Sequence, residues 1–367
     1  MKVLLSGGGT GGHVNPALAI GAVIEKHDPQ AEIHYAGTPR GIENKLVTAY
    51  PMHHIEIQGL RRSLSPSNLK TAYLTIKSFG KAKKLLKELK PDLVVGTGGY
   101  VCWPVVRAAA ALGIPTALHE SNAVPGLAAK MLCKKVDCIF VNFPDTASLL
   151  PGCKEVLHVG TPLREEFGST HTEKIQLPDG CEKYILCFGG SLGAKRLNAE
   201  VLQLMKDYGT THPTVCIQLA TGARAYGEVK ESFAQMGLEN YPNLVLSEYI
   251  YDMPARMKGC DLIICRSGAM TLSEVAAVGK ASILIPSPNV TNDQQTKNAK
   301  VLSDKGAAVL LRESELSEGK LTNAVKELME NDAARLDMAK KAQTFAVRDA
   351  EERIFKKLQS IVKEYQK

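Results

Sequence analysis

The chain has no apolar run long enough to cross a membrane. A helix that spans a bilayer needs about 20 consecutive apolar residues, and the 367-residue sequence contains no such run. The opening residues, MKVLLSGGG, place only a short apolar run after one lysine, which is less than the core of a secretory signal requires. We therefore expect a protein that acts in the cytoplasm and does not cross a membrane.

Cysteine pairs, aromatic residues and metal motifs are scarce as well. The nine cysteines are odd in number, form no C-x-x-C pair and mostly stand inside apolar runs. This pattern is typical of buried thiols, not of a disulfide framework or a zinc site. Aromatic residues make up 5% of the chain and no recognition motif is present, so nucleic acid is not an expected partner. No Asp-x-Asp pair occurs, and we expect neither a metal nor another cofactor.

Positive charge is abundant but unevenly distributed. Residues 1–164 carry a net charge of +8 and the remaining residues a net charge of −1. Most of the excess lies in residues 60–90, where nine Lys or Arg residues are opposed by Glu88 alone. A concentrated positive segment of this kind predicts an anionic partner.

The basic segment has two interpretations. A helical projection of residues 69–89 separates a lysine face from an apolar face, so the helix could lie on an anionic membrane surface. The lysine face holds Lys70, Lys77, Lys81 and Lys84, and the apolar face holds Leu69, Ala72, Tyr73, Ile76, Phe79 and Leu86. The alternative is an ordinary helix of an α/β domain, apolar inside and charged outside. Both hold together if Leu60 and Leu64 of LRRSLS face lipid.

The two halves of the chain repeat one pattern of strand, glycine loop and helix. Residues 2–20, KVLLSGGGTGGHVNPALAI, have a counterpart in residues 184–205, and residues 91–121 have one in residues 260–288. Runs of Val, Ile and Leu that alternate with helical patterns are typical of parallel sheets covered on both faces. The length also exceeds what one hydrophobic core usually serves.

The expected fold class is therefore α/β, with two Rossmann-like, doubly wound parallel-sheet domains that face each other across a cleft. Ligands of such sheets bind outside the carboxyl ends of the strands, so the glycine loops should line that cleft. We expect an N-terminal domain at 1–163 and a C-terminal domain at 164–340. Residues 341–367 should form a helix that packs back toward the N-terminal domain.

The first glycine loop matches a dinucleotide fingerprint only in part. Gly7, Gly9 and Gly12 spell G-x-G-x-x-G between a strand and a helix. A nicotinamide-type site also needs an acidic residue at the end of the second strand, but AEIHYAG is followed by Thr38 and Pro39. The loop is thus better interpreted as an anion site at a helix N-terminus, or as a tight turn that needs glycine only for packing.

The second half supplies the missing acid. In RSGAMTLSE, at residues 266–274, the first-turn amides of a helix could hold a phosphate, while Glu274 could accept two hydrogen bonds from ribose hydroxyls. The adjacent amides of Gln294 and Gln295 suit sugar hydroxyls. Each feature has a simpler reading, because Glu274 could be a helix-dipole acid and the glutamines could be solvated. Together they predict a sugar nucleotide.

These motifs occur together in one known family. The sequence resembles the GT-B glycosyltransferases, and among them the peptidoglycan enzymes that convert lipid I into lipid II, over nearly its whole length. The likeness rests, in order, on GGTGGHVNPALA, GTGGYVCWPV, HESN, VGTPLR, GGSLGAKRLN and CRSGAMTLSEVAAVGKASILIP followed by DQQ. One departure is Ser121, where the family commonly has Gln, so acceptor contacts there are expected to differ.

The resemblance implies a reaction and its partners. N-acetylglucosamine would pass from UDP-N-acetylglucosamine to the C4 hydroxyl of the muramoyl residue of lipid I, undecaprenyl-pyrophosphoryl-MurNAc-pentapeptide, with inversion at the anomeric carbon. UDP and lipid II would be the products. The enzyme would sit peripherally on the cytoplasmic face of the cell membrane, an anionic surface, with cell-wall and division proteins as further partners.

The resemblance also assigns binding residues. The backbone around Ile250 would read uracil with Arg164 nearby, and Glu274 would take the ribose. Further donor contacts would come from Thr10, Gly11, Gly12, Asn122, Ser191, Ala269, Met270, Thr271, Gln294 and Gln295. The N-terminal domain would bind the acceptor and associate with the membrane, and the C-terminal domain would bind the donor. The acceptor's pyrophosphate would suit the amides of Gly8 to Gly12 and of Gly98 and Gly99. Acceptor contacts are expected of Gly8, Gly9, Asn15, Gly98, Gly99 and Tyr100.

The transfer needs a base, because a sugar hydroxyl is a poor nucleophile until its proton is removed. His13, at the rim of the first loop, is the first candidate, since an imidazole changes charge near neutral pH. His119 and Glu120, at the end of a strand, are the alternatives. His13 could instead only bind the acceptor or cap the loop.

Other functions remain open from the sequence alone. The same fold and donor motifs would serve a transferase that acts on another lipid, or a UDP-N-acetylglucosamine epimerase. A UDP-sugar-binding protein without catalytic activity is the alternative from a different class.

Overall fold

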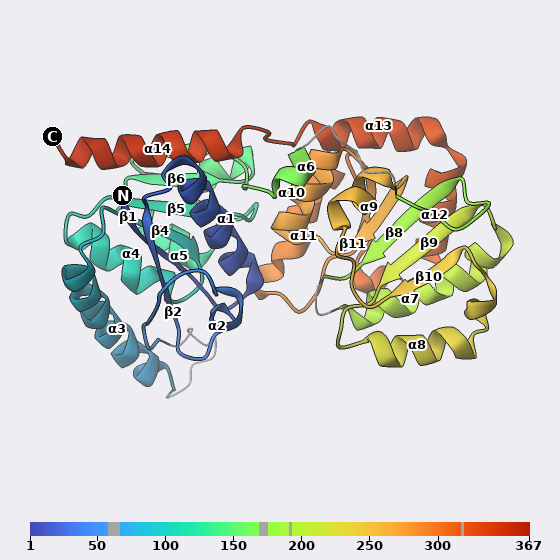
Figure 1. Ribbon diagram of the computed structural model, residues 1–367, viewed down its shortest axis with the longest axis horizontal. Helices are drawn as coiled ribbons and strands as arrows, with labels where there is room; N and C mark the ends of the chain where they lie inside the picture. Colours follow the sequence, from blue (N-terminus) through green and yellow to red (C-terminus); the bar gives the residue numbers. More distant parts are fainter. Residues whose placement is uncertain (58–66, 169–174, 191–192, 317–318) are drawn as a thin grey trace. The chain divides into compact units, whose positions relative to one another are not determined.

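The computed structural model describes residues 1–57, 67–168, 175–190, 193–316 and 319–367. The chain forms two compact units. Unit 1 consists of Met1–Pro162 together with Asp349–Lys367, and unit 2 is Leu163–Arg348. Each unit contains one parallel sheet, as Figure 1 shows.

Unit 1 holds a seven-stranded sheet in the order β3-β2-β1-β4-β5-β6-β7, in which every neighbouring pair is parallel. Its strands are β1 (Lys2–Gly7), β2 (Glu32–Gly37), β3 (Met52–His54), β4 (Leu93–Gly98), β5 (Thr116–Glu120), β6 (Cys138–Val141) and β7 (Val156–His158). Its helices are α1 (Gly11–His27), α2 (Glu43–Leu46), α3 (Ser67–Leu89), α4 (Cys102–Ala111), α5 (Leu127–Leu132), η1 (Pro144–Leu149) and α14 (Ala350–Tyr365).

Helices cover both faces of this sheet because successive strand residues point to opposite sides. Val3 and Leu5 of β1 pack with α1 and α14, whereas Leu4 of β1 packs with α3 and α4 on the other face. The last helix, α14, closes the first of these layers. Its end is held by the Tyr365 hydroxyl, which donates to Asp137 over 2.9 Å.

Unit 2 holds a six-stranded parallel sheet in the order β10-β9-β8-β11-β12-β13. Its strands are β8 (Lys183–Phe188), β9 (Val215–Ala220), β10 (Leu244–Ser247), β11 (Leu262–Cys265), β12 (Ala281–Leu284) and β13 (Val309–Leu310). Its α-helices are α6 (Glu165–Gly168), α7 (Lys195–Asp207), α8 (Tyr226–Gln235), α9 (Met253–Gly259), α10 (Ala269–Val278), α11 (Gln294–Ser303), α12 (Lys320–Glu330) and α13 (Asp332–Gln343). Its 3-10 turns are η2 (Gly209–Thr211), η3 (Leu238–Asn240), η4 (Thr291–Asp293) and η5 (Glu313–Glu315).

The central strands β9, β11 and β12 are buried along their whole length, and β4 is buried except at Gly98, which is why they read as unbroken apolar runs. The expectation of two Rossmann-like parallel-sheet domains is confirmed. All nine cysteines are free thiols. In the described ranges, no helix combines the length and the apolar character needed to span a membrane.

Candidate active site

The first glycine loop of unit 1 leaves β1 and is pinned by its own peptide groups. The carbonyl oxygen of Gly7 accepts a hydrogen bond from the Tyr35 hydroxyl over 2.8 Å. The amide of Gly8, on the other side of that peptide bond, donates to the carbonyl of Gly98 over 3.3 Å. The loop is thereby tied to β2 and β4, the two strands that flank β1.

The next peptide group of the loop orients His13. The Gly8 carbonyl oxygen lies 3.1 Å from His13 Nδ1, and the hydroxyl of Thr10 lies 3.2 Å from the same nitrogen. Because a carbonyl oxygen only accepts, Nδ1 must carry the hydrogen. In the neutral ring the lone pair is then on Nε2, the atom that a general base needs to present.

The glycines at the end of β4 make room for this ring. A Cβ on Gly98 would lie 2.7 Å from His13 Cδ2 and 3.1 Å from Nε2. A Cβ on Gly99 would collide with the carbonyl of Gly8. Both glycines also have positive φ, +104° and +80°, a conformation that favours glycine. Gly98 and Gly99 therefore leave the space that the His13 ring and the first glycine loop occupy.

The loop offers fewer amides to an anion than the sequence suggests. The amide of Gly8 is used by Gly98, and that of Gly9 donates to Glu43 Oε2 over 3.2 Å. Both amides already have acceptors inside the protein, so the geometry does not favour them for the predicted contact with the pyrophosphate. Within the described ranges the amides of Thr10, Gly11 and Gly12 have no acceptor, as expected at the start of α1.

Two further residues predicted to contact the sugar acceptor, Asn15 and Tyr100, lie close to glycines of this loop. Asn15 is exposed in the first turns of α1. Tyr100 is 37% exposed, and its ring lies against Gly9, 3.0 Å from where a Cβ on that glycine would be. Both side chains are therefore placed where a ligand on the loop would meet them.

His119 lies at the end of β5 in a very different setting. It is 2% exposed, its Nε2 donates to the Gly160 carbonyl over 2.8 Å, and its Nδ1 accepts from the Ser121 hydroxyl over 3.2 Å. Burial lowers the pKa of His119 to about 4, although the bond to Gly160 acts in the opposite direction. A neutral ring with both nitrogens engaged is a structural histidine, so the geometry does not favour His119 as base.

Glu120 organises the loop that follows β5. Its Oε1 accepts from the backbone amide and the side-chain amide of Asn122, over 2.9 and 3.0 Å. Its Oε2 accepts from the Gly126 amide over 2.8 Å. At 7% exposure, Glu120 is more suited to holding Asn122 in place than to removing a proton from a substrate.

In unit 2 the turn after β11 presents the N-terminus of α10. Gly268 is the N-cap, and the Leu272 amide is the first to bond back, to the Gly268 carbonyl over 3.0 Å. No acceptor for the amides of Ala269, Met270 and Thr271 is found in the described ranges. These three amides point along the helix axis in the way that suits a phosphate group.

Glu274 lies one turn further along α10. It is half-buried, and in the described part of the chain its carboxylate has no hydrogen bond. Desolvation by burial raises the pKa of Glu274 to about 7, and the charge of Arg164 offsets part of that rise. Arg164 is exposed and lies over the Phe167 ring at 5.4 Å.

The glutamine loop begins α11. Gln294 and Gln295 are both half-buried, and Gln295 Oε1 accepts from the Ser287 amide over 2.8 Å. The Ser267 hydroxyl donates to the Gln295 carbonyl over 2.8 Å, which joins this loop to the start of α10. The two residues before the glutamines, Asn292 and Asp293, have φ of +59° and +52°, a strained conformation that is typical of functional loops.

The remaining predicted donor contacts are less defined. Ile250 is 5% exposed after β10. On either side of it, Tyr249 and Tyr251 are 51% and 86% exposed and their rings meet edge to face at 4.9 Å. Ser191 lies outside the described residues.

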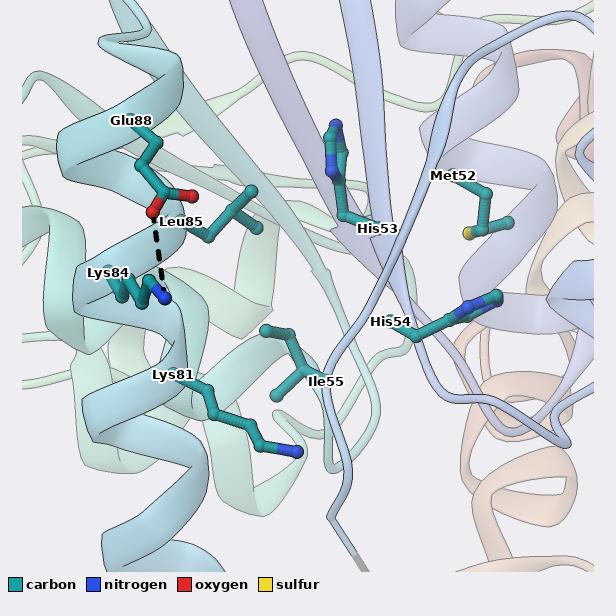
Figure 2. A pocket seen from close by; sticks show the side chains of 8 residues that line it. All are labelled: Met52, His53, His54, Ile55, Lys81, Lys84, Leu85 and Glu88. Carbon is teal, nitrogen blue, oxygen red and sulfur yellow. Dashed lines mark ion pairs between the residues drawn. The ribbon is translucent and has the colours of Figure 1, made fainter.

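A cavity of about 420 Å³ lies elsewhere in unit 1, between the edge strand β3 and α3. Figure 2 shows its lining: Met52, His53, His54, Ile55, Lys81, Lys84, Leu85 and Glu88. None of these residues belongs to the predicted site. The lysines are paired with carboxylates, Lys81 with Glu56 at 3.1 Å and Lys84 with Glu88 at 3.9 Å, so the cavity is not a strong anion site.

Glu43 is the residue that the sequence analysis missed. It lies at the start of α2, is 0% exposed and holds the first glycine loop through Gly9. Its sequence signal is faint: GTPRGIE places Glu43 shortly after Gly37 and Gly41. A Cβ on either glycine would press against the Glu43 side chain.

In the described ranges, no group of three or more His, Cys, Asp or Glu residues could hold a metal ion.

Two family models match the chain. The N-terminal domain of glycosyltransferase family 28 matches residues 3–141, and the C-terminal domain of that family matches residues 184–354. The chain belongs to glycosyltransferase family 28. It is accordingly a hexosyltransferase, and the glycine loops of its two units lie in the two matched domains.

Members of family 28 include close full-length relatives. The chain is 40% identical over 368 residues to the UDP-N-acetylglucosamine–N-acetylmuramyl-(pentapeptide) pyrophosphoryl-undecaprenol N-acetylglucosamine transferase of Lactococcus lactis subsp. lactis, covering 99% of this chain and 100% of that one. The crystal structure of Acinetobacter baumannii MurG has a TM-score of 0.79 at 31% identity, covering 98% of this chain and 99% of that one.

A second solved structure shares the fold alone. A putative UDP-N-acetylglucosamine 2-epimerase from Listeria monocytogenes has a TM-score of 0.68 at 14% identity, covering 99% of this chain and 97% of the other. The family 28 assignment therefore rests on the matched domains and the full-length relatives, not on fold similarity.

Proposed function

We propose that the chain transfers N-acetylglucosamine from UDP-N-acetylglucosamine to the muramoyl C4 hydroxyl of lipid I, which gives lipid II and UDP for peptidoglycan synthesis. The observation that carries this proposal is the full-length relationship to a transferase of that name. The two sites described above supply complementary support, since one suits a nucleotide sugar and the other an acceptor with an anionic group.

Unit 2 would bind the donor. The amides of Ala269, Met270 and Thr271 would take the diphosphate, because the positive end of α10 stabilises negative charge. Glu274 would accept hydrogen bonds from the ribose hydroxyls, and a carboxylate without a protein donor is suited to two such bonds. Gln294 and Gln295 would meet the sugar hydroxyls, Ile250 the uracil through its backbone, and Arg164 would lie nearby.

Unit 1 would bind the acceptor. The amides of Thr10, Gly11 and Gly12 would hold the pyrophosphate of lipid I at the start of α1. His13 Nε2 would remove the proton of the C4 hydroxyl as its oxygen forms a bond to the anomeric carbon. The bond from that carbon to the phosphate oxygen breaks at the same time, and UDP leaves with the electron pair.

The decisive experiment measures lipid II formation and UDP release with and without lipid I. His13→Ala should lower kcat by about 10²- to 10⁴-fold, the range typical for loss of a general base, without weakening UDP-N-acetylglucosamine binding. His27→Ala is the matched control. His27 lies at the C-terminal end of α1, far from the loop, where it is exposed and stacks on Phe355.

The outcomes separate the competing functions. A variant that kept most of its turnover would remove His13 as base. Conversion of the donor to a 2-epimer without any acceptor would identify an epimerase. Donor binding without turnover on any lipid would identify a binding protein.

The chain would act at the cytoplasmic face of the membrane, held there by α3. Ala82 and Leu86 of this helix are buried in unit 1, as in an ordinary α/β helix, while Ile76 is 75% exposed beside exposed Lys77. The side chains of Leu69, Lys70, Ala72 and Tyr73, and the whole of Leu60 and Leu64, lie outside the described part. Changing Lys77, Lys81 and Lys84 to Glu should weaken binding to anionic vesicles, and unchanged binding would contradict this attachment.

A further inference from the structure

A single peptide group lies between Glu43 and His13. Its carbonyl oxygen, on Gly8, is 3.1 Å from His13 Nδ1. Its N–H, on Gly9, donates to Glu43 Oε2 over 3.2 Å. The carboxylate, the peptide and the imidazole thus form one continuous chain of hydrogen bonds.

Glu43 is built into the protein as a charged group. It is 0% exposed, and its other oxygen accepts from both the amide and the hydroxyl of Thr38, over 2.8 and 2.7 Å. No salt bridge to it occurs in the described ranges. Burial alone would raise the pKa of Glu43, but the hydrogen bonds from Thr38 and Gly9 outweigh it and hold the pKa below its usual value.

The surrounding backbone is shaped to admit this carboxylate. A Cβ on Gly8 would lie 2.8 Å from Glu43 Oε1, a Cβ on Gly37 would lie 2.7 Å from its Cγ, and one on Gly41 would collide with the carboxylate itself. A buried charge without an ion-pair partner lowers the stability of a protein. Three glycines that leave room for this one side chain indicate that its position is required in spite of that cost.

We propose that Glu43 is a positioning residue which acts on His13 through the Gly8–Gly9 peptide group. A carboxylate that accepts from the peptide N–H polarises the peptide, and its carbonyl oxygen becomes a stronger acceptor. That oxygen then holds the hydrogen of His13 on Nδ1 and leaves Nε2 as the basic atom. It also stabilises the imidazolium that forms once Nε2 has taken a proton.

The other titratable groups near these hydrogen bonds stay neutral at physiological pH. Tyr35, on β2, is buried, and desolvation together with the charge of Glu43 raises its pKa far above the usual value. Cys102, at the start of α4, is also buried, and desolvation raises the pKa of its thiol to about 12. Thr10 adds only a neutral hydroxyl at Nδ1. Glu43 is therefore the charge that biases the histidine through this path.

The inference rests on the proposed role of His13 as base, but its first test does not. Nitrogen-15 NMR of the imidazole rings, with His13 assigned by its loss in His13→Ala, measures the tautomer and the titration midpoint in the enzyme without substrates. In Glu43→Gln the side chain keeps one acceptor oxygen, so either Thr38 or Gly9 must face an amide donor. The Nδ1–H tautomer of His13 should lose population, and the nitrogen-15 titration of its ring should differ from that of the parent protein.

Asp137→Asn is the matched control. Asp137 is also a buried carboxylate of unit 1, and it accepts from the amide and hydroxyl of Thr116 over 2.9 and 3.1 Å. We expect a similar loss of Tm with no change in the His13 signals. A Glu43→Gln spectrum in which tautomer and midpoint match the parent protein would overturn the inference.

Kinetics then separate this inference from the function it rests on. Glu43→Gln should lower kcat about tenfold and shift the acidic limb of the pH profile, where protonation of the base abolishes activity. KM for the donor should stay constant. Glu43→Asp, which keeps the charge, should recover part of both effects, and it serves if Glu43→Gln does not fold. An NMR shift with unchanged kcat would retain the relay and remove His13 from catalysis, whereas a loss of kcat without any NMR shift would refute the relay.

Discussion

One carboxyl group in each unit, buried Glu43 in unit 1 and half-buried Glu274 in unit 2, has opposite surroundings. In unit 1, Glu43 receives three hydrogen bonds from the protein and its pKa is held below the usual value. In unit 2, Glu274 receives none in the described part of the chain, and burial raises its pKa to about 7. A carboxylate that the protein satisfies shapes the loop around it, whereas one left unsatisfied is available to a ligand.

The glycine loop of unit 1 and the glutamine loop of unit 2 differ in a similar way. The loop of unit 1 is tied at two successive peptide groups, and its strained φ values fall on glycines. The glutamine loop of unit 2 places its positive φ values on Asn292 and Asp293, where a side chain makes that conformation costly. We infer that the loop of unit 1 is preorganised without a ligand, and that the groups of unit 2 would be fully stabilised only by a bound ligand such as the proposed donor.

Glu274→Gln should break this contrast most strongly. The substitution removes the carboxylate that would accept both ribose hydroxyls, so UDP affinity should fall by about 10- to 100-fold, in line with about 1.5–3 kcal/mol for a hydrogen bond to a charged group. Isothermal titration calorimetry with UDP measures this directly. Glu239→Gln, at an exposed position of the same unit, serves as the control, and an unchanged affinity in Glu274→Gln would remove the ribose role.

The same variant should change how stability depends on pH. Because the pKa of Glu274 is raised in the folded state, the folded protein holds this proton more tightly than the unfolded chain does. Stability of the ligand-free protein should therefore fall as pH rises from about 4.5 to 7, by roughly 1–2 kcal/mol after allowance for its partial exposure. Glu274→Gln should lack this component, and thermal melts at pH 5 and pH 8 compare the two. Identical pH slopes in the two proteins would contradict it.

The fold was predictable because its signals are local. Apolar strands and glycine loops repeat in both halves, and parallel sheets follow from that repetition. The roles of His13 and His119 were not separable in this way, since both lie near the carboxyl end of a strand and only burial by distant segments distinguishes them. Ser121 and Gly160 form hydrogen bonds with the two ring nitrogens of His119. No spacing in the sequence predicts the contact with Gly160.

Glu43 was missed for a related reason. Its partner Gly9 is far away in the sequence, and the two meet only because β2 lies beside β1 in the sheet. The same long-range pairing explains why the amides of Gly8 and Gly9, which are predicted to bind the pyrophosphate, already have acceptors inside the protein. Which amides of a glycine loop remain available depends on acceptors that the rest of the domain brings to it.

The smallest expected effect tests the strain in the glutamine loop. Asn292→Gly removes the side chain at φ +59°, so the free energy of unfolding should rise by about 0.5–1 kcal/mol, the size typical for relief of a left-handed residue. UDP-N-acetylglucosamine should bind slightly less tightly, because the looser loop presents Gln294 and Gln295 in more conformations before binding. Asn240→Gly, at a residue with ordinary φ that ends an exposed turn of the same unit, is the control and should not be stabilised. If Asn292→Gly left both Tm and affinity unchanged, the strain would have no part in donor binding, and the contrast between the units would rest on the two carboxylates alone.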